Sequence, residues 1–217
     1  FAKICQKSSS SKNALHESRH QPEASSINQT MAIPQRICFV VTSPFTIRVF
    51  MLRHLEALAA RYDVTVIYNP AESPGIPLHF DSRIRLIELD INRRISLWDD
   101  LAGFFSLLRI FRRERFFVVH TITPKAGLLG QIAAWIERVP FRVHTFTGQV
   151  WVTRQGIFRF ILKMVDKLYA ACATHVLVDC PSQRVFLVEQ GFLPDGRGLV
   201  LGGGSISGVD VERFAPG

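Results

Sequence analysis

Short apolar runs alternate along this chain with longer stretches in which apolar residues recur at helical spacing. Residues 37–41 are continuously apolar, which is typical of a strand covered on both faces. Six later runs predict further strands, at residues 64–68, 84–89, 116–119, 142–146, 175–178 and 199–201. Repeated strand–helix units of this length predict an α/β fold built on a Rossmann-like, doubly wound parallel sheet.

Helices are predicted between these strands. The first places Val49, Leu52, Leu55 and Ala59 on one face. A second, long amphipathic helix carries one apolar stripe, which consists of Leu97, Leu101, Phe104, Phe105, Leu108 and Phe111, while Leu107 and Ile110 fall off it. Three further helices are expected at residues 124–137, 157–171 and 182–190.

The beginning of the chain differs from the rest. Its first thirty residues contain seven Ser and no aromatic residue after Phe1, so they cannot bury enough surface to order themselves. We expect residues 1–33 to be a disordered or read-through segment, with Met31 as the natural start. Residues 34–205 are expected to form a single domain.

Composition narrows the class of protein. The chain has 26 Lys and Arg against 18 Asp and Glu, a net charge of +8, and 47% hydrophobic residues, which excludes a disordered chain. No run reaches the roughly 18 apolar residues of a transmembrane helix. The four Cys have no zinc-site spacing, so no metal site is expected. Nothing in the sequence indicates an oxidising compartment, and a cytoplasmic location is expected.

Ligands of parallel α/β sheets bind at the carboxyl ends of the strands, so the loops there are the candidate site. Thr123 can cap the helix that Pro124 opens, and Lys125 then lies in its first turn, a position that suits a phosphate or diphosphate. A solvated Lys after an ordinary cap explains these residues equally well. Thr147 and Gly148 begin a polar loop suited to sugars, although a glycine turn with structural hydroxyls is the alternative.

Other polar residues give weaker signals. His120 and His144 lie at strand ends, where an acid or base could act, but a structural role is favoured for both. No G-x-S-x-G or H-E-x-x-H motif is present. The glycine-rich residues 202–208 favour a flexible connection over a phosphate cradle.

A basic surface is predicted near the end of the long helix. Arg109, Arg112 and Arg113 lie beside Leu107 and Ile110, an arrangement that could rest on anionic lipid headgroups. Arg stems that only cover a core helix are the alternative reading. A nucleic-acid groove has no supporting motif.

Several motifs resemble one known family. They are residues 36–42, Arg48 in the following helix, H-T-x-T-P-K-x-G-x-L-G at 120–130, F-T-G at 146–148 and G-V-D-x-x-R-F-x-P at 208–216. Together they resemble the amino-terminal half of family-four retaining glycosyltransferases. Within this family they are most similar to the branch that extends polyprenyl-diphosphate-linked sugars of capsule and O-antigen.

This resemblance implies a GT-B architecture, in which two Rossmann-like domains enclose the active site. The amino-terminal half would bind the acceptor, and a carboxyl-terminal half with a Glu-x7-Glu motif would bind the nucleotide sugar. No two Glu of this chain have that spacing. Residues 206–217 are therefore expected to begin an interdomain linker, with the donor-binding domain missing.

The resemblance also suggests roles for individual residues. The predicted acceptor-binding residues are Ser43, Phe45, Thr46, Arg48, Thr123, Pro124, Lys125, Gly127, Thr147, Gly148 and Arg154. Lys125 would suit the acceptor diphosphate. Thr147 stands where many relatives carry a His that approaches the transferred sugar, so a His-assisted step is in doubt. No catalytic residue and no metal ligand is predicted.

The sequence thus predicts the acceptor-binding half of a metal-independent transferase. The whole enzyme would move a hexose or N-acetylhexosamine from a nucleotide sugar, as co-substrate, to a polyprenyl-linked glycan. It would use no cofactor, bind no nucleic acid and rest on an anionic membrane, at the inner face of the cell membrane. The isolated chain is expected to be inactive.

Two rival functions remain open. A sugar-nucleotide epimerase with the same two-domain plan would need carboxylates in the strand-end loops, where only Asp179 stands. A non-enzymatic membrane-binding module is the other alternative.

Overall fold

The computed structural model describes residues 35–76, 81–94, 96–204 and 206–208. The predicted segment 1–33, including Met31, lies outside the described residues, as do residues 209–217 of the predicted linker.

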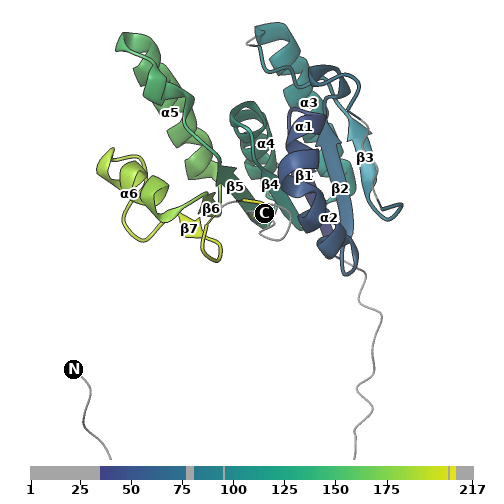
Figure 1. Cartoon of the computed structure of the whole chain (residues 1–217). Coiled ribbons are helices and arrows are strands. Elements are labelled where there is room, and N and C mark those ends of the chain that lie inside the picture. Colours follow the sequence, from purple (N-terminus) through teal and green to yellow (C-terminus); the bar gives the residue numbers. More distant parts are fainter. Residues whose placement is uncertain (1–34, 77–80, 95, 205, 209–217) are drawn as a thin grey trace, which may run out of the picture. The chain divides into compact units, whose positions relative to one another are not determined.

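Seven strands form one parallel sheet in the order β3-β2-β1-β4-β5-β6-β7 (Figure 1). The strands are β1 (Arg36–Val40), β2 (Asp63–Tyr68), β3 (Arg85–Glu88), β4 (Val118–Thr121), β5 (Phe141–Phe146), β6 (His175–Val178) and β7 (Leu199–Val200). The doubly wound α/β fold predicted from the sequence is confirmed. The strand order reverses between β1 and β4, and such a switch point is where ligands of these folds bind.

Helices and short turns connect the strands. They are α1 (Pro44–Thr46), η1 (Ile47–Met51), α2 (Leu52–Ala59), η2 (Pro70–Glu72), α3 (Leu97–Glu114), α4 (Pro124–Ile136), η3 (Val150–Thr153), α5 (Gly156–Cys172) and α6 (Pro181–Glu189). Their bounds lie within a few residues of the predicted ones. The largest differences are at α3, which continues three residues beyond Phe111, and at β4, which begins two residues later than expected.

Alternate residues of the central strands enter two separate cores. On β1, Cys38 and Val40 pack with α3 and α4, whereas Ile37 and Phe39 pack with α2 on the opposite face. A third core joins α5 and α6 to β5 and β6 around the fully buried Trp151. This period-two alternation is what a sheet covered on both faces requires.

The buried face of the first helical segment differs from the predicted one. Residues 47–51 form a π-helical turn, so the buried residues follow a spacing of four: Ile47, Met51, Leu55 and Ala59. Val49, predicted to be on the same face as Leu55, is 44% exposed. The prediction for Val49 is wrong because a uniform helix of 3.6 residues per turn was assumed.

The apolar stripe predicted for α3 is also partly wrong. Leu107, predicted to lie off the stripe, is fully buried with Gly103 and Phe111, and Ile110 packs against the same core. Leu101 and Phe105, predicted to be on the stripe, are 47% and 55% exposed. The amino-terminal half of α3 extends beyond the ends of the strands in Figure 1, so its apolar residues have little of the sheet to pack against.

Candidate functional site

Three crest loops follow neighbouring strands at the switch point: residues 41–46 after β1, 122–125 after β4 and 147–155 after β5. Each contains a buried side-chain atom with no hydrogen-bond partner, namely Thr42 Oγ1, Thr123 Oγ1 and Gln149 Nε2. Buried polar groups are nearly always paired in folded proteins. Gln131 Oε1 on α4 and Tyr169 Oη on α5 are unpaired as well, but among the described residues only the crest has three such groups in adjacent loops, where a polar ligand or water can complete the hydrogen bonding.

The first crest loop is held by its own hydroxyls and by an arginine from elsewhere. Ser43 caps α1, since its Oγ accepts a hydrogen bond from the Thr46 backbone N–H at 3.4 Å. Arg93 Nη2 donates to the same Ser43 Oγ at 3.1 Å, and the backbone N–H of Arg93 donates to Glu72 at 2.5 Å. Ser43 and Thr46 are buried, whereas the Arg93 side chain is half exposed. Arg93 Nε also lies 3.9 Å from Glu72 Oε2, so Arg93 brings a half-exposed cation that is paired with a carboxylate to this loop.

Lys125 has a different environment from the predicted one. Its Nζ lies 2.6 Å from Asp100 Oδ1, and it also donates to the Arg94 carbonyl oxygen. Only 11% of the Lys125 side chain is exposed. The anion that compensates this cation at the start of α4 is thus a carboxylate of the chain itself, and the prediction of a Lys125 free to bind a diphosphate is not supported.

Thr123 and Gly127 also differ from their predicted roles. Thr123 occupies the N-cap position of α4 but makes no capping hydrogen bond, so its hydroxyl is the unpaired group described above. Gly127 is buried where α4 approaches β5, and a Cβ there would lie 2.7 Å from His144 Cε1 and 3.1 Å from Tyr169 Cε2. Gly127 is therefore required for close helix–sheet packing and does not line the crest.

The remaining predicted residues are at the surface. Phe45, Arg48, Pro124, Thr147, Gly148 and Arg154 are all exposed. Arg154 lies over the Phe158 ring, with 6.0 Å between the guanidinium carbon and the ring centroid. The crest loops thus offer Arg154 as an exposed cation and Thr147 as an exposed hydroxyl. Arg48 of η1 is also exposed, and Arg93, which is half exposed and paired with Glu72, contacts the first loop from outside it. Their roles in acceptor binding remain predictions.

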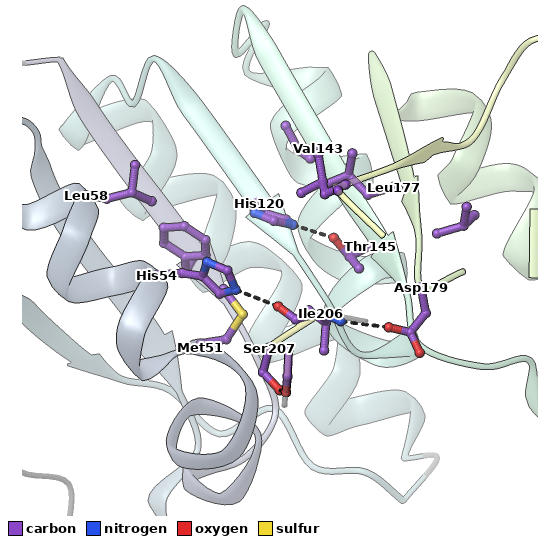
Figure 2. Close-up of a pocket in the computed structure, with 15 residues that line it drawn as sticks. Met51, His54, Leu58, His120, Val143, Thr145, Leu177, Asp179, Ile206 and Ser207 are labelled. Atoms are coloured by element: carbon purple, nitrogen blue, oxygen red, sulfur yellow. Dashed lines mark hydrogen bonds between the residues drawn. The ribbon is translucent and has the colours of Figure 1, made fainter. Parts of the chain in front are cut away.

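A cavity of about 560 Å³ lies next to the crest, on the α2 side of β1, β4, β5 and β6 (Figure 2). Its lining is largely apolar, and none of the predicted acceptor-binding residues contributes to it. His120 Nε2 and Thr145 Oγ1 form a hydrogen bond of 2.8 Å across its floor. His54 Nε2 lies 2.5 Å from the Ile206 carbonyl oxygen, and the Ile206 N–H donates to Asp179 at 2.8 Å. The segment 206–208 is thereby fixed along the cavity's edge.

Both histidines at the strand ends are neutral near pH 7. Burial, with a smaller contribution from the nearby His54, lowers the pKa of His120 to about 4. Burial likewise lowers the pKa of His144 to about 3, with a smaller contribution from His120. A neutral His120 can still donate or accept one hydrogen bond at the cavity.

His144 has the structural role that the sequence favoured. It is 1% exposed, and its Nδ1 lies 2.7 Å from Thr121 Oγ1. Gln131 Nε2 donates to the same Thr121 oxygen at 2.8 Å and to the Val143 carbonyl oxygen at 2.7 Å. This network ties α4 to β4 and β5 beneath the crest. It therefore anchors the middle of α4 to the sheet.

Sequence reasoning missed Arg93 and His54. Arg93 belongs to the segment between β3 and α3, where basic residues carried no motif, and its contact with Ser43 spans fifty positions. His54 had no evident partner in the sequence.

Among the described residues no group of three His, Cys, Asp or Glu could hold a metal ion. None of the described helices is long and apolar enough to span a bilayer.

The sheet order, the switch point and the crest loops define a Rossmann-like domain of the GT-B class. A family model of the glycosyl transferase 4-like domain matches residues 46–204, and the chain belongs to this family. The family resemblance inferred from the sequence motifs is thereby confirmed.

Two named relatives are similar in sequence. The capsular polysaccharide biosynthesis glycosyltransferase CapM of Staphylococcus aureus is 32% identical over 135 residues, which are 62% of this chain and 35% of the relative. A UDP-Gal:alpha-D-GlcNAc-diphosphoundecaprenol alpha-1,3-galactosyltransferase of Escherichia coli is 27% identical over 158 residues, 72% of this chain and 39% of the relative. The chain thus matches little more than a third of either relative's length.

Solved structures support the fold alone, because their sequences are distant. A sucrose-phosphate synthase from Thermosynechococcus elongatus has a TM-score of 0.53 at 17% identity, covering 76% of this chain and 47% of the other. A Listeria monocytogenes protein described as a UDP-N-acetylglucosamine 2-epimerase has a TM-score of 0.55 at 14% identity, covering 74% and 43%. Transferases and epimerases share this fold, so the fold does not choose between them.

Proposed function

We propose that this chain supplies the acceptor-binding part of a retaining glycosyltransferase acting on polyprenyl-diphosphate-linked glycans. The whole enzyme transfers a hexose or N-acetylhexosamine from a nucleotide sugar, without a metal cofactor. Membership of the transferase family supports this activity. The E. coli relative's name includes a diphosphoundecaprenol acceptor, which supports the acceptor class. Transfer requires a donor-binding half, as the family resemblance implies, and takes place at the inner face of the cell membrane.

One observation carries the assignment of the acceptor site to the crest. Thr42, Thr123 and Gln149 place unpaired buried polar atoms in three adjacent loops. An unpaired buried group costs about 1–3 kcal/mol, and a hydroxyl-rich ligand relieves this cost when it binds. The half-exposed Arg93 supplies the charge for the diphosphate, the role that the sequence assigned to Lys125. Its pairing with Glu72 is long, at 3.9 Å, and leaves the guanidinium accessible.

The epimerase alternative is weaker for this chain. Its proton transfers require a carboxylate directed at the substrate, and Asp179 is the only acid of the predicted strand-end loops. Asp179 instead accepts the Ile206 N–H at 2.8 Å, which fixes the adjacent chain segment. No further observation favours an epimerase.

Arg93→Gln tests the site directly. The ligand is a water-soluble N-acetylglucosaminyl diphosphate with a short alkyl chain, titrated into the 217-residue chain by calorimetry. We expect about tenfold weaker binding, because a charge-assisted contact is lost. Arg112→Gln, which removes an exposed cation at the far end of α3, serves as control. Equal affinities of the two variants would contradict the assignment.

Thr123→Val offers a second test with two readouts. Valine has nearly the same shape but no hydroxyl, so the free protein no longer buries an unpaired group. We expect the free energy of unfolding to rise by about 1 kcal/mol while affinity for the same ligand falls. A variant that gains stability and binds as tightly as the wild type would place Thr123 outside the site.

A further inference from the structure

Helix α5 has a second apolar face, which the core does not use. Its buried side includes Asp166, Tyr169 and Ala170. Five large apolar residues lie on another side, and we call them the α5 stripe: Ile157, Phe160, Ile161, Met164 and Leu168, with exposed fractions of 73%, 59%, 49%, 47% and 51%. Their spacing of three, one, three and four residues keeps them on one helix face. Surface helices normally carry polar residues there.

More apolar surface continues the α5 stripe at the crest. Val150 and Val152 of η3 and Phe158 at the start of α5 are each close to half exposed. In Figure 1 the amino-terminal part of α5 extends beyond the strand ends, so the stripe begins at the level of the crest loops. Contiguous exposed apolar surface of this kind marks an interaction site.

A row of cations runs along one side of the α5 stripe. Arg159, Lys163 and Lys167 recur every four residues, which places them side by side along the helix. The only acid on α5 is Asp166, which is buried and accepts a hydrogen bond from Trp151 at 3.0 Å. None of the three cations has an ion-pair partner within the described part of the chain.

The cations repel one another. Burial lowers the pKa of Lys163 from its ordinary value, and the neighbouring Lys167 and Arg159 lower it further. Lys163 and Arg159 are also held over the Trp151 ring, at 5.2 Å and 5.7 Å from its centroid. Lys163 Nζ also donates to the Gln190 carbonyl oxygen at 2.7 Å, so Arg159 and Lys163 are held on the side of α5 next to Trp151. The three cations are partly exposed beside the α5 stripe, and an anionic surface would relieve their repulsion.

We propose that the α5 stripe and its cation row bind the surface of an anionic lipid bilayer, with α5 lying in the headgroup plane. An apolar face and an adjoining positive strip are the two components that stable interfacial helices combine. A second copy of the chain fits less well, because a symmetric contact would bring two rows of cations together. This inference rests on the proposed function, since the crest loops can reach a membrane-borne acceptor only if they face the bilayer.

The previously predicted surface lacks one of these components. Arg109, Arg112 and Arg113 are exposed, but Leu107 is fully buried beside them and Ile110 packs against the core. That part of α3 offers charge without apolar area. The exposed apolar residues of α3, including Leu97 and Trp98, lie at its opposite end.

The test measures binding of the 217-residue chain to vesicles by sedimentation. Vesicles of phosphatidylcholine with phosphatidylglycerol are compared with vesicles of phosphatidylcholine alone. Phe160→Ser combined with Met164→Ser shortens the α5 stripe, and Lys167→Glu reverses one charge of the row. Trp135→Ser with Ile136→Ser is the matched apolar control, because these residues at the end of α4 are 57% and 46% exposed. Arg112→Glu is the matched charge control.

We expect the wild type to sediment with the anionic vesicles, and each α5 variant to bind them about tenfold less. Both controls should bind within about twofold of the wild type. The proposal is overturned if the wild type does not bind, if the controls lose as much as the α5 variants, or if the stripe variant binds normally. It is also overturned if the chain is a dimer that the stripe variant dissociates.

A separate readout distinguishes this proposal from the proposed function. Calorimetry with the soluble acceptor analogue involves no bilayer, so the stripe variant should bind that analogue as the wild type does. If the wild type fails to bind the analogue but sediments with vesicles through α5, the membrane surface stands and the acceptor assignment falls. If the stripe variant loses analogue binding, α5 belongs to the acceptor site and the bilayer proposal is overturned.

Discussion

Gly127 shows how a motif residue can have a packing role. A Cβ at this position would lie 2.7 Å from His144 Cε1, closer than real Cβ contacts allow, and both groups are buried. We expect Gly127→Ala to lower the free energy of unfolding by about 1–3 kcal/mol, because α4 must move away from β5. Urea denaturation measures this change.

Gly203→Ala is the control for this substitution. A Cβ at Gly203 would meet no atom within 4 Å. Its free energy of unfolding should stay within about 0.5 kcal/mol of the wild type. If the two Gly→Ala variants were equally stable, the claim that α4 lies too close to β5 to admit a Cβ at Gly127 would be contradicted.

Lys125 and Arg93 mark the limit of what single positions reveal in a sequence. The sequence placed Lys125 correctly at the start of a helix, and elementary electrostatics required an anion near it. Its partner Asp100 lies 25 positions away, on a helix whose packing the sequence did not fix. The contact of Arg93 with Ser43 was equally out of reach. Residue types thus predicted a charged site. The carboxylate partners of its cations, Asp100 for Lys125 and Glu72 for Arg93, are known only from the fold.

At the scale of elements, hydrophobic periodicity predicted the positions of the helices along the chain well. It predicted the buried face of each helix less well. The runs behind β1, β2 and β6 are short, rich in β-branched residues and followed by turn residues, so a strand fitted them better than a helix. The α3 pattern allowed two apolar faces, and the sequence chose the one with more Phe and Leu. Packing against α4 buries Gly103, Leu107 and Phe111 instead.

Leu107→Ala tests the observed buried face of α3. Leu107 is fully buried in the core between α3 and α4, so its truncation should cost about 2–5 kcal/mol of unfolding free energy. Leu101→Ala, on the face that the sequence favoured, should cost less than about 1 kcal/mol because Leu101 is 47% exposed. Comparable losses in thermal or urea unfolding would show that both faces are packed in solution.

For the whole molecule, the alternation of strands and helices was sufficient to predict a doubly wound sheet and its ligand edge. It could not predict the cavity beside that edge, because the cavity depends on which sheet face the helices leave open. Among the described residues, α2 covers β1 and β2 on that face, while Val143 of β5 and Leu177 of β6 line the open cavity. The crossover connections place α3, α4 and α5 on the other side.

The two central histidines make the stability of this sheet depend on pH. The pKa values of His120 and His144 are lowered from 6.5 to about 4 and about 3 by burial. Below pH 6.5 the unfolded chain binds protons at these positions and the folded chain does not, so stability falls as the pH falls. Asp166 acts oppositely, because burial raises its pKa from 3.8 to about 6 and the folded chain keeps that proton between these pH values.

Between pH 7 and pH 5 the two imidazoles together lower the free energy of unfolding by more than the Asp166 carboxyl raises it. We therefore expect the free energy of unfolding at pH 5 to be lower than at pH 7, by on the order of 2 kcal/mol. Urea denaturation across this range measures the slope. Asp166→Asn should steepen it, because the opposing carboxyl is removed while the amide oxygen can still accept from Trp151. His144→Asn should flatten it, whatever its effect at pH 7, because one of the two imidazoles with a lowered pKa is removed. If His144→Asn had the same pH dependence of the unfolding free energy as the wild type, this imidazole would be protonated within the folded sheet.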